Sequence, residues 1–156
     1  MPNVECLLTL NGRLLMIEAD DGRWVPIQSA VTKGESPLEA CSREVTRLTG
    51  LHVSPSCAGV VYAVEDSEHD YTLVFVADAT AEGSESLSKA LRWVDLHGIK
   101  HRDDVPALHR ELVPLLLTAD GPLVVILDND GPEPLLKESA PIAHARLSPL
   151  VFAIAQ

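Results

Sequence analysis

Four charged residues have types and spacing that could do chemistry: Glu35, Arg43, Glu44 and Arg47. Carboxylates are the ligands that hard divalent cations such as Mg²⁺ take, and arginine binds phosphate through a planar fork of N–H donors. Glu44 and Arg47 are three residues apart, so they lie on one face of a helix. The same spacing also allows a plain salt bridge between them, so the sequence leaves a chemical and a structural interpretation open.

The sequence predicts that a helix carries this set. Ser36 is a candidate N-cap, Pro37 suits the first helical position, and Glu39 completes a capping box. Gly50 suits the position that ends a helix. One apolar stripe at helical spacing predicts the buried face: Leu38, Cys41, Val45 and Leu48.

Short apolar runs on both sides of this helix predict a mixture of strands and a second helix. Five runs predict strands: residues 4–10, 13–19, 24–31, 57–64 and 71–79. Asn11-Gly12 predicts a tight hairpin turn between the first two runs, and the last two predict a long hairpin. A short strand or bend is expected at residues 91–96, and helical spacing predicts a second helix from about Val105 to Thr118.

The segment from Trp24 to Leu51 resembles the signature of the Nudix hydrolases, G-x5-E-x7-R-E-U-x-E-E-x-G-U, where U is a bulky apolar residue. Three parts carry the resemblance: Gly34-Glu35-Ser36, Arg43-Glu44-Val45 and Thr49-Gly50-Leu51. It extends over roughly Val4 to Leu117, because the expected order of strands and helices is also similar. The fold class that it implies is α/β, a Nudix-like α/β/α sandwich with a mixed sheet and a C-terminal extension.

The signature is degenerate at two places. Ser29 stands at the first glycine, and Gln28 stands where a second glycine is common. Arg47 and Leu48 replace the Glu-Glu pair, on the helix face that in the family holds a metal ion against a pyrophosphate. An arginine about 4 Å from a divalent ion, at an effective dielectric of about 20, costs roughly 8 kcal/mol before relaxation. That is comparable with the binding energy of a micromolar ligand.

The resemblance implies a pyrophosphatase that hydrolyses a nucleoside diphosphate linked to another group, with Mg²⁺ or Mn²⁺ as cofactor. Glu44 would be the catalytic residue with Arg43 orienting it, and the metal ligands would be Glu44, Glu35 and Glu85. Three residues would contact the substrate: Arg47, Ser29 and Gln28. Because the signature is degenerate, the resemblance leaves open whether this enzyme is active.

Two other functions stay open. The chain could be a non-catalytic Nudix-like module that binds a nucleotide or metabolite, with Arg47 replacing the metal as the counter-charge of a phosphate. It could also be a structural domain that dimerises through its apolar C-terminal tail. Fold alone does not decide among the three functions.

Length and charge bound these expectations further. The chain has 156 residues and a net charge of −11. We expect one domain over 1–156, with 121–156 as an extension packed on the core or at a homodimer interface. The charge disfavours nucleic acid and anionic membranes as partners and leaves a small nucleotide derivative. Three separate cysteines and no signal peptide predict a cytoplasmic protein with reduced thiols.

Other catalytic patterns are missing from the sequence. There is no Ser-His-Asp pattern, no phosphate-binding glycine loop and no dinucleotide fingerprint. His97, His101 and His109 do not form an HExxH arrangement, and we expect them to be surface residues.

Overall fold

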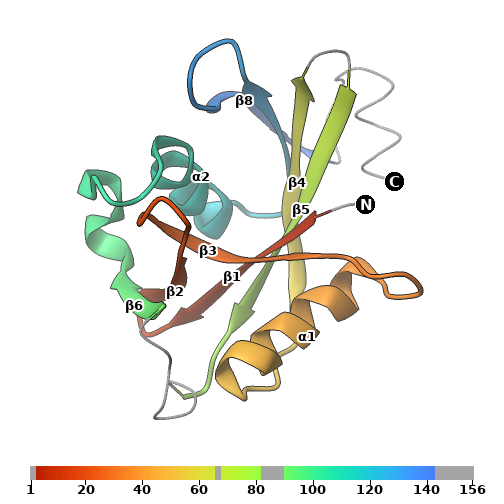
Figure 1. Ribbon diagram of the computed structural model, residues 1–156, viewed down its shortest axis with the longest axis vertical. Coiled ribbons are helices and arrows are strands. Elements are labelled where there is room, and N and C mark those ends of the chain that lie inside the picture. The colour runs from red at the N-terminus through yellow and green to blue at the C-terminus, as the bar shows by residue number, and fades with distance from the viewer. Residues whose placement is uncertain (1–2, 66–67, 82–89, 143–156) are drawn as a thin grey trace.

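The computed structural model describes residues 3–65, 68–81 and 90–142. Within them, one mixed sheet of eight strands has the order β6-β2-β3-β1-β5-β4-β7-β8 (Figure 1). The strands are β1 (Asn3–Leu10), β2 (Arg13–Glu18), β3 (Trp24–Ala30), β4 (Ser56–Glu65), β5 (Glu68–Asp78), β6 (Leu91–Asp95), β7 (Leu123–Asp128) and β8 (Leu135–Pro141). The helices are α1 (Pro37–Thr49), α2 (Ala107–Thr118) and the short 3₁₀ helix η1 (Leu96–His101).

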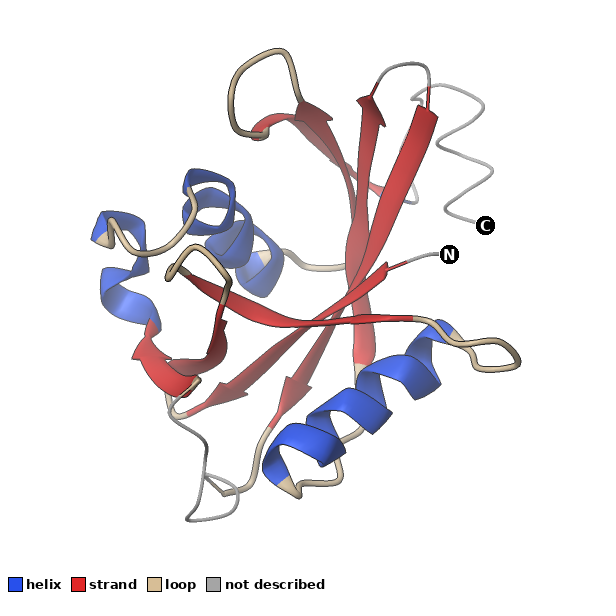
Figure 2. Cartoon of the chain, viewed as in Figure 1, coloured by secondary structure: helices blue, strands red, loops and turns tan. Residues whose placement is uncertain are grey.

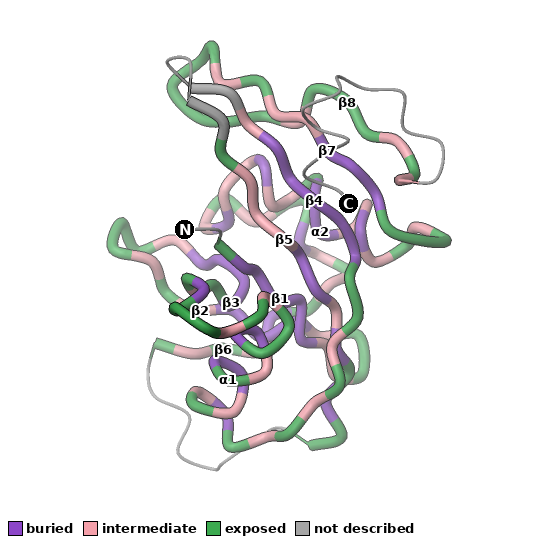
Figure 3. Tube along the Cα trace, turned by 90° about the vertical axis from the view of Figure 1, so that its right-hand side faces the viewer, coloured by how far each residue is buried: buried purple, intermediate pink, exposed green. Residues whose placement is uncertain are grey.

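The two α-helices cover opposite faces of the sheet (Figure 2). Alternate residues of a strand point to opposite faces, so β1 supplies both layers. Val4, Cys6 and Leu8 pack in the cluster that includes α1, whereas Leu7 packs in the cluster that includes α2. Buried residues accordingly follow the central strands (Figure 3). The predicted arrangement of helix, mixed sheet and helix is confirmed.

Helix α1 begins and ends where the sequence predicts. The backbone N–H of Glu39 donates to the Ser36 hydroxyl at 3.1 Å, and the Ser36 N–H donates to the Glu39 carboxylate at 3.0 Å. Gly50 ends the helix with φ of 75°, a conformation that glycine adopts without strain. The predicted stripe is wrong at Leu38, which is 45% exposed, because the buried surface of α1 begins later, at Ala40 and Cys41.

Helix α2 begins two residues later than predicted. Val105 was expected inside the helix, but the first helical residue is Ala107. A proline disfavours the helical conformation of the residue before it, so Pro106 keeps Val105 out of the helix. Val105 is nevertheless buried against the core.

The C-terminal part of the described chain adds two strands. Strand β7 pairs in parallel with β4, and β8 pairs with β7 as an antiparallel edge strand. The close approach of β4 and β7 requires Gly59, because a Cβ atom there would lie 2.5 Å from the carbonyl oxygen of Leu123. The apolar stretch at residues 147–154 lies outside the described residues. No helix in the described ranges is long and apolar enough to cross a membrane.

Candidate functional site

The turn that leads into α1 is held by a pair of charged side chains. Arg43 donates from Nε to Glu35 Oε2 at 2.7 Å and from Nη2 to Glu35 Oε1 at 3.1 Å. Glu35 Oε1 also accepts from the backbone N–H of Thr32 at 3.1 Å and from its hydroxyl at 3.0 Å. These hydrogen bonds, that from Arg43 first, lower the pKa of Glu35 to about 2. Both oxygens of this carboxylate are therefore engaged.

Arg43 also ties α1 to strand β3. Its Nη2 donates to the hydroxyl of Ser29 at 3.3 Å and to the carbonyl oxygen of Ala30 at 3.2 Å. The guanidinium thus joins the helix, the preceding turn and the strand at one point.

Glu44, the residue expected to be catalytic, is buried and ion-paired. Only 8% of the residue is exposed. Arg47 donates from Nε to Glu44 Oε2 at 3.1 Å and from Nη2 to Glu44 Oε1 at 2.5 Å. Arg43 Nη1 adds a longer contact to Glu44 Oε2 at 3.4 Å. The two arginines therefore neutralise Glu44 and occupy both of its oxygens.

The described residues present no preformed site for a divalent metal ion. Mg²⁺ takes six oxygen ligands, which are usually one or two carboxylates together with waters and substrate phosphates. In the described part of the chain, no group of three or more His, Cys, Asp or Glu side chains is placed to hold one. Glu35 and Glu44 are both bound by arginines. Glu85, the other predicted ligand, lies outside the described residues.

A second polar cluster lies on the other face of the sheet, beneath α2. Glu5 of β1 is only 4% exposed. Its Oε2 accepts a hydrogen bond from Gln28 Nε2 at 3.0 Å and lies 3.2 Å from His109 Nε2. Its Oε1 is buried and has no hydrogen-bond partner among the described residues, and the same holds for Nδ1 of His109.

The sequence did not single out this cluster. The prediction that His109 is a surface residue is wrong, because α2 packs its side chain onto β1 and leaves it 12% exposed. His97 and His101 are exposed as predicted. The available signal was Glu5 itself, since it is the one charged residue in the apolar run 3–10.

A cavity of about 320 Å³ opens beside Glu5. Its wall comes from β1, β3 and β5: Asn3, Val4, Glu5, Gln28, Ser29, Ala30 and Thr72. Ser29 and Ala30 are also the residues that Arg43 binds, although neither Arg43 nor Arg47 lines the cavity. Of the three predicted substrate-contacting residues, the structure places Gln28 and Ser29 in this wall and Arg47 beside Glu44.

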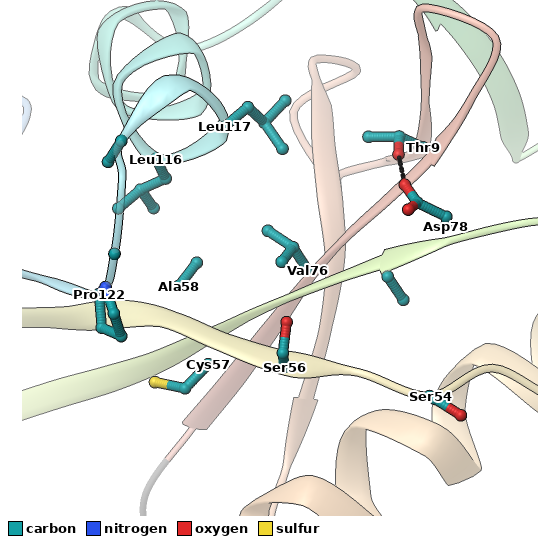
Figure 4. A pocket seen from close by; sticks show the side chains of 13 residues that line it. Thr9, Ser54, Ser56, Cys57, Ala58, Val76, Asp78, Leu116, Leu117 and Pro122 are labelled. Carbon is teal, nitrogen blue, oxygen red and sulfur yellow. Dashed lines mark hydrogen bonds between the residues drawn. The ribbon is translucent and has the colours of Figure 1, made fainter.

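Another cavity, of about 370 Å³, lies at the other end of β1, near the C-terminal end of α2 (Figure 4). The Thr9 hydroxyl donates to Asp78 there at 2.8 Å, and burial raises the pKa of the Cys57 thiol. No lysine or arginine is among its lining residues, so this cavity offers no counter-charge to a phosphate.

No protein-family model and no curated protein sequence matches the chain. Its structure, however, is similar to that of the mutator MutT protein of Bacillus halodurans, with a TM-score of 0.64 at 20% identity over 89% of this chain and 95% of that chain. A NUDIX-family hydrolase of Clostridium perfringens gives a TM-score of 0.61 at 18% identity, over 74% of this chain and 94% of that chain. The NUDIX domain of Shewanella oneidensis NrtR, solved with ADP ribose, gives a TM-score of 0.59 at 12% identity, over 73% of this chain and 84% of that chain.

These identities are low, so the likeness concerns the fold. It agrees with the mixed sheet between two helices. The chain has the fold of the Nudix hydrolases.

Proposed function

We propose that this chain is a Nudix-fold domain that binds a small nucleotide derivative through its phosphates and does not hydrolyse it with a divalent metal. The observation that carries the proposal is the pair between Arg47 and Glu44, in which both carboxylate oxygens accept from the guanidinium. A metal ion would have to displace Arg47. It would then find a single freed carboxylate, and waters and substrate phosphates would have to supply its other ligands.

In this proposal, Arg47 binds a phosphate through the part of its guanidinium that Glu44 does not occupy. Its side chain is 62% exposed, and its Nη1 makes no hydrogen bond to any described residue. A guanidinium is suited to phosphate because its planar donors match the phosphate oxygens. The NrtR domain of the same fold was solved with ADP ribose, which supports this class of ligand.

Metal-dependent hydrolysis is the second candidate function. It is favoured by the retained Glu35, Arg43 and Glu44, and by the hydrolase among the similar structures. It requires Arg47 to leave Glu44 and extend into solvent. It also requires more oxygen ligands than Glu44 alone provides.

Calorimetry separates the two candidates. The protein is titrated with ADP ribose and with inorganic pyrophosphate in the presence of EDTA, and then with Mg²⁺ and Mn²⁺ alone. We expect binding of the phosphate compounds without metal, no binding of either metal up to millimolar concentration, and no product from ADP ribose. Metal-dependent turnover that disappears in Glu44→Gln would instead establish hydrolysis.

The role of Arg47 has a charge-matched control. Arg47→Glu should weaken pyrophosphate binding about tenfold or more, since a charge-assisted hydrogen bond is replaced by repulsion. It should also create two carboxylates one turn apart and allow millimolar Mn²⁺ binding. Lys137→Glu, on the exposed strand β8, makes the same change in net charge and should leave both affinities unaltered. Equal pyrophosphate affinity in Arg47→Glu and wild type would contradict the proposal.

A further inference from the structure

Cys6 and Cys41 are far apart in the sequence but lie against each other in the fold. Cys6 belongs to the central strand β1 and Cys41 to helix α1, and each is 1% exposed. Both belong to one packed cluster between α1 and the sheet, and the Cys6 thiol donates a hydrogen bond to the Cys41 sulfur. The third cysteine, Cys57, is exposed and lines the cavity near the C-terminal end of α2 (Figure 4). The fold therefore pairs two thiols and leaves one apart.

Small side chains at this contact let the helix come close to the strand. The buried surface of α1 begins with Ala40 and Cys41, so no long side chain separates the helix backbone from β1 there. A disulfide needs the two Cα atoms within about 7 Å of each other and the two Cβ atoms about 4 Å apart. Because the sulfurs of Cys6 and Cys41 are already hydrogen-bonded, both side chains point toward a common place. A bond between the two sulfurs therefore requires a movement of the side chains and a small adjustment of the backbone.

The hydrogen bond between the two thiols also makes them unequal in reactivity. It lowers the pKa of Cys41, against the raising effect of burial, and it is the largest of the causes that raise the pKa of Cys6. The thiolate is the reactive form of cysteine, so Cys41 is the thiol that reacts first with an oxidant. Cys6 keeps its proton and lies next to Cys41, where a second thiol can complete a disulfide.

We propose that Cys6 and Cys41 are an oxidisable thiol pair, which hydrogen peroxide converts into a disulfide that ties α1 to β1. The Cys41 thiolate attacks one oxygen of the peroxide, the O–O bond breaks, and a sulfenic acid and hydroxide form. The hydroxide takes up the proton that Cys41 released. The Cys6 sulfur then attacks the Cys41 sulfur, an S–S bond forms, and the S–OH group leaves as water with the proton of Cys6. The two sulfurs together lose two electrons, and the peroxide is reduced to two molecules of water.

The disulfide would anchor the helix that carries the arginine cluster. Arg43, Glu44 and Arg47 all belong to α1, and Arg43 already ties this helix to β3 through hydrogen bonds. A covalent bond from Cys41 to β1 would add a second attachment close to Arg43. The proposal does not depend on phosphate binding, because its readouts are the covalent link itself and the stability of the fold.

Peptide mapping on the unaltered protein tests the proposal. The protein is treated with hydrogen peroxide, free thiols are blocked with N-ethylmaleimide in urea, and the non-reduced digest is analysed by mass spectrometry. We expect two peptides joined through Cys6 and Cys41, two hydrogen atoms lighter than the separate peptides and separable with dithiothreitol. Because burial slows the access of peroxide, a second sample is refolded from urea in its presence. Absence of this link from both samples, or a preference for links to Cys57, would overturn the proposal.

The melting temperature shows whether the disulfide fits the folded chain. Cys57→Ser keeps the pair, and we expect oxidation to raise its Tm by about 5–10 °C, because the cross-link restricts the unfolded chain. Dithiothreitol should reverse the shift. Cys6→Ser removes one member of the pair, so peroxide should not raise its Tm, and if this variant does not fold, the oxidised and reduced forms of Cys57→Ser decide the matter. A disulfide that forms in Cys57→Ser and lowers the Tm would mean that the folded positions do not accommodate it, which contradicts the proposal.

Discussion

Glu44 and Glu5 are the two buried acidic residues in the described core, and they lie on opposite faces of the sheet. Glu44, on the α1 face, has both oxygens bound by arginine. Glu5, on the α2 face, has one oxygen contacted by Gln28 and His109, and its other oxygen has no partner among the described residues. The charge of Glu44 is thus compensated by arginine, whereas the carboxylate of Glu5 is only partly hydrogen-bonded.

The difference lies in how many carboxylate oxygens have hydrogen-bond partners inside the protein. A buried carboxylate that is fully paired is held in place by its partners, but its oxygens are not free for a metal or a ligand. A buried carboxylate with an unpaired oxygen is unfavourable for the folded protein. The hydrogen bonding therefore distinguishes a fully paired acid at Glu44 from a partly paired acid at Glu5.

The largest expected effect on stability is at Glu44. Glu44→Gln removes the negative charge between Arg43 and Arg47 and turns one acceptor into a donor that faces a guanidinium. We expect the free energy of unfolding to fall by about 2 kcal/mol, from the loss of charge-assisted hydrogen bonds. Urea denaturation measures it, with Glu138→Gln as the exposed control. A change as small as that of the control would mean that the Arg47 pair contributes nothing to the fold.

A smaller effect of the opposite sign is expected at Glu5. Glu5→Gln removes a buried charge that is only half satisfied, and its amide can keep the bonds to Gln28 and His109. We expect the free energy of unfolding to stay the same or to rise by about 1 kcal/mol. Urea denaturation of Glu5→Gln and wild type measures this difference in the free energy of unfolding. A loss as large as that of Glu44→Gln would show that Glu5 is held for stability, and the contrast between the two acids would disappear.

Local patterns predicted the elements of the α1 face well. The capping box at Ser36, the glycine that ends the helix and the three-residue spacing of Glu44 and Arg47 are all set by residues within one or two turns. A salt bridge between Glu44 and Arg47 was one of the two interpretations that the spacing allowed, and it is the one observed.

The α2 face could not be predicted in the same way. Glu5 and His109 are 104 residues apart in the sequence, and only the packing of α2 on β1 brings them together. Strand β8 was also missed, because it is an edge strand with mostly exposed residues and lacks a buried apolar face. Contacts that depend on tertiary packing leave no periodic signal in a single sequence.

The smallest effect concerns Glu35 and appears only in acid. Its hydrogen bonds lower its pKa from an ordinary value of 4.5 to about 2. A carboxylate with a lowered pKa stabilises the folded state fully above its unfolded pKa, and this contribution is lost as the pH falls toward the folded pKa. The melting temperature of Glu35→Gln should therefore lie below that of wild type at about pH 6, and the gap should narrow between about pH 4.5 and about pH 2. A gap that stays constant over this range would show that the ionised Glu35 does not hold the turn, and that Arg43 is positioned by Ser29 and Ala30 instead.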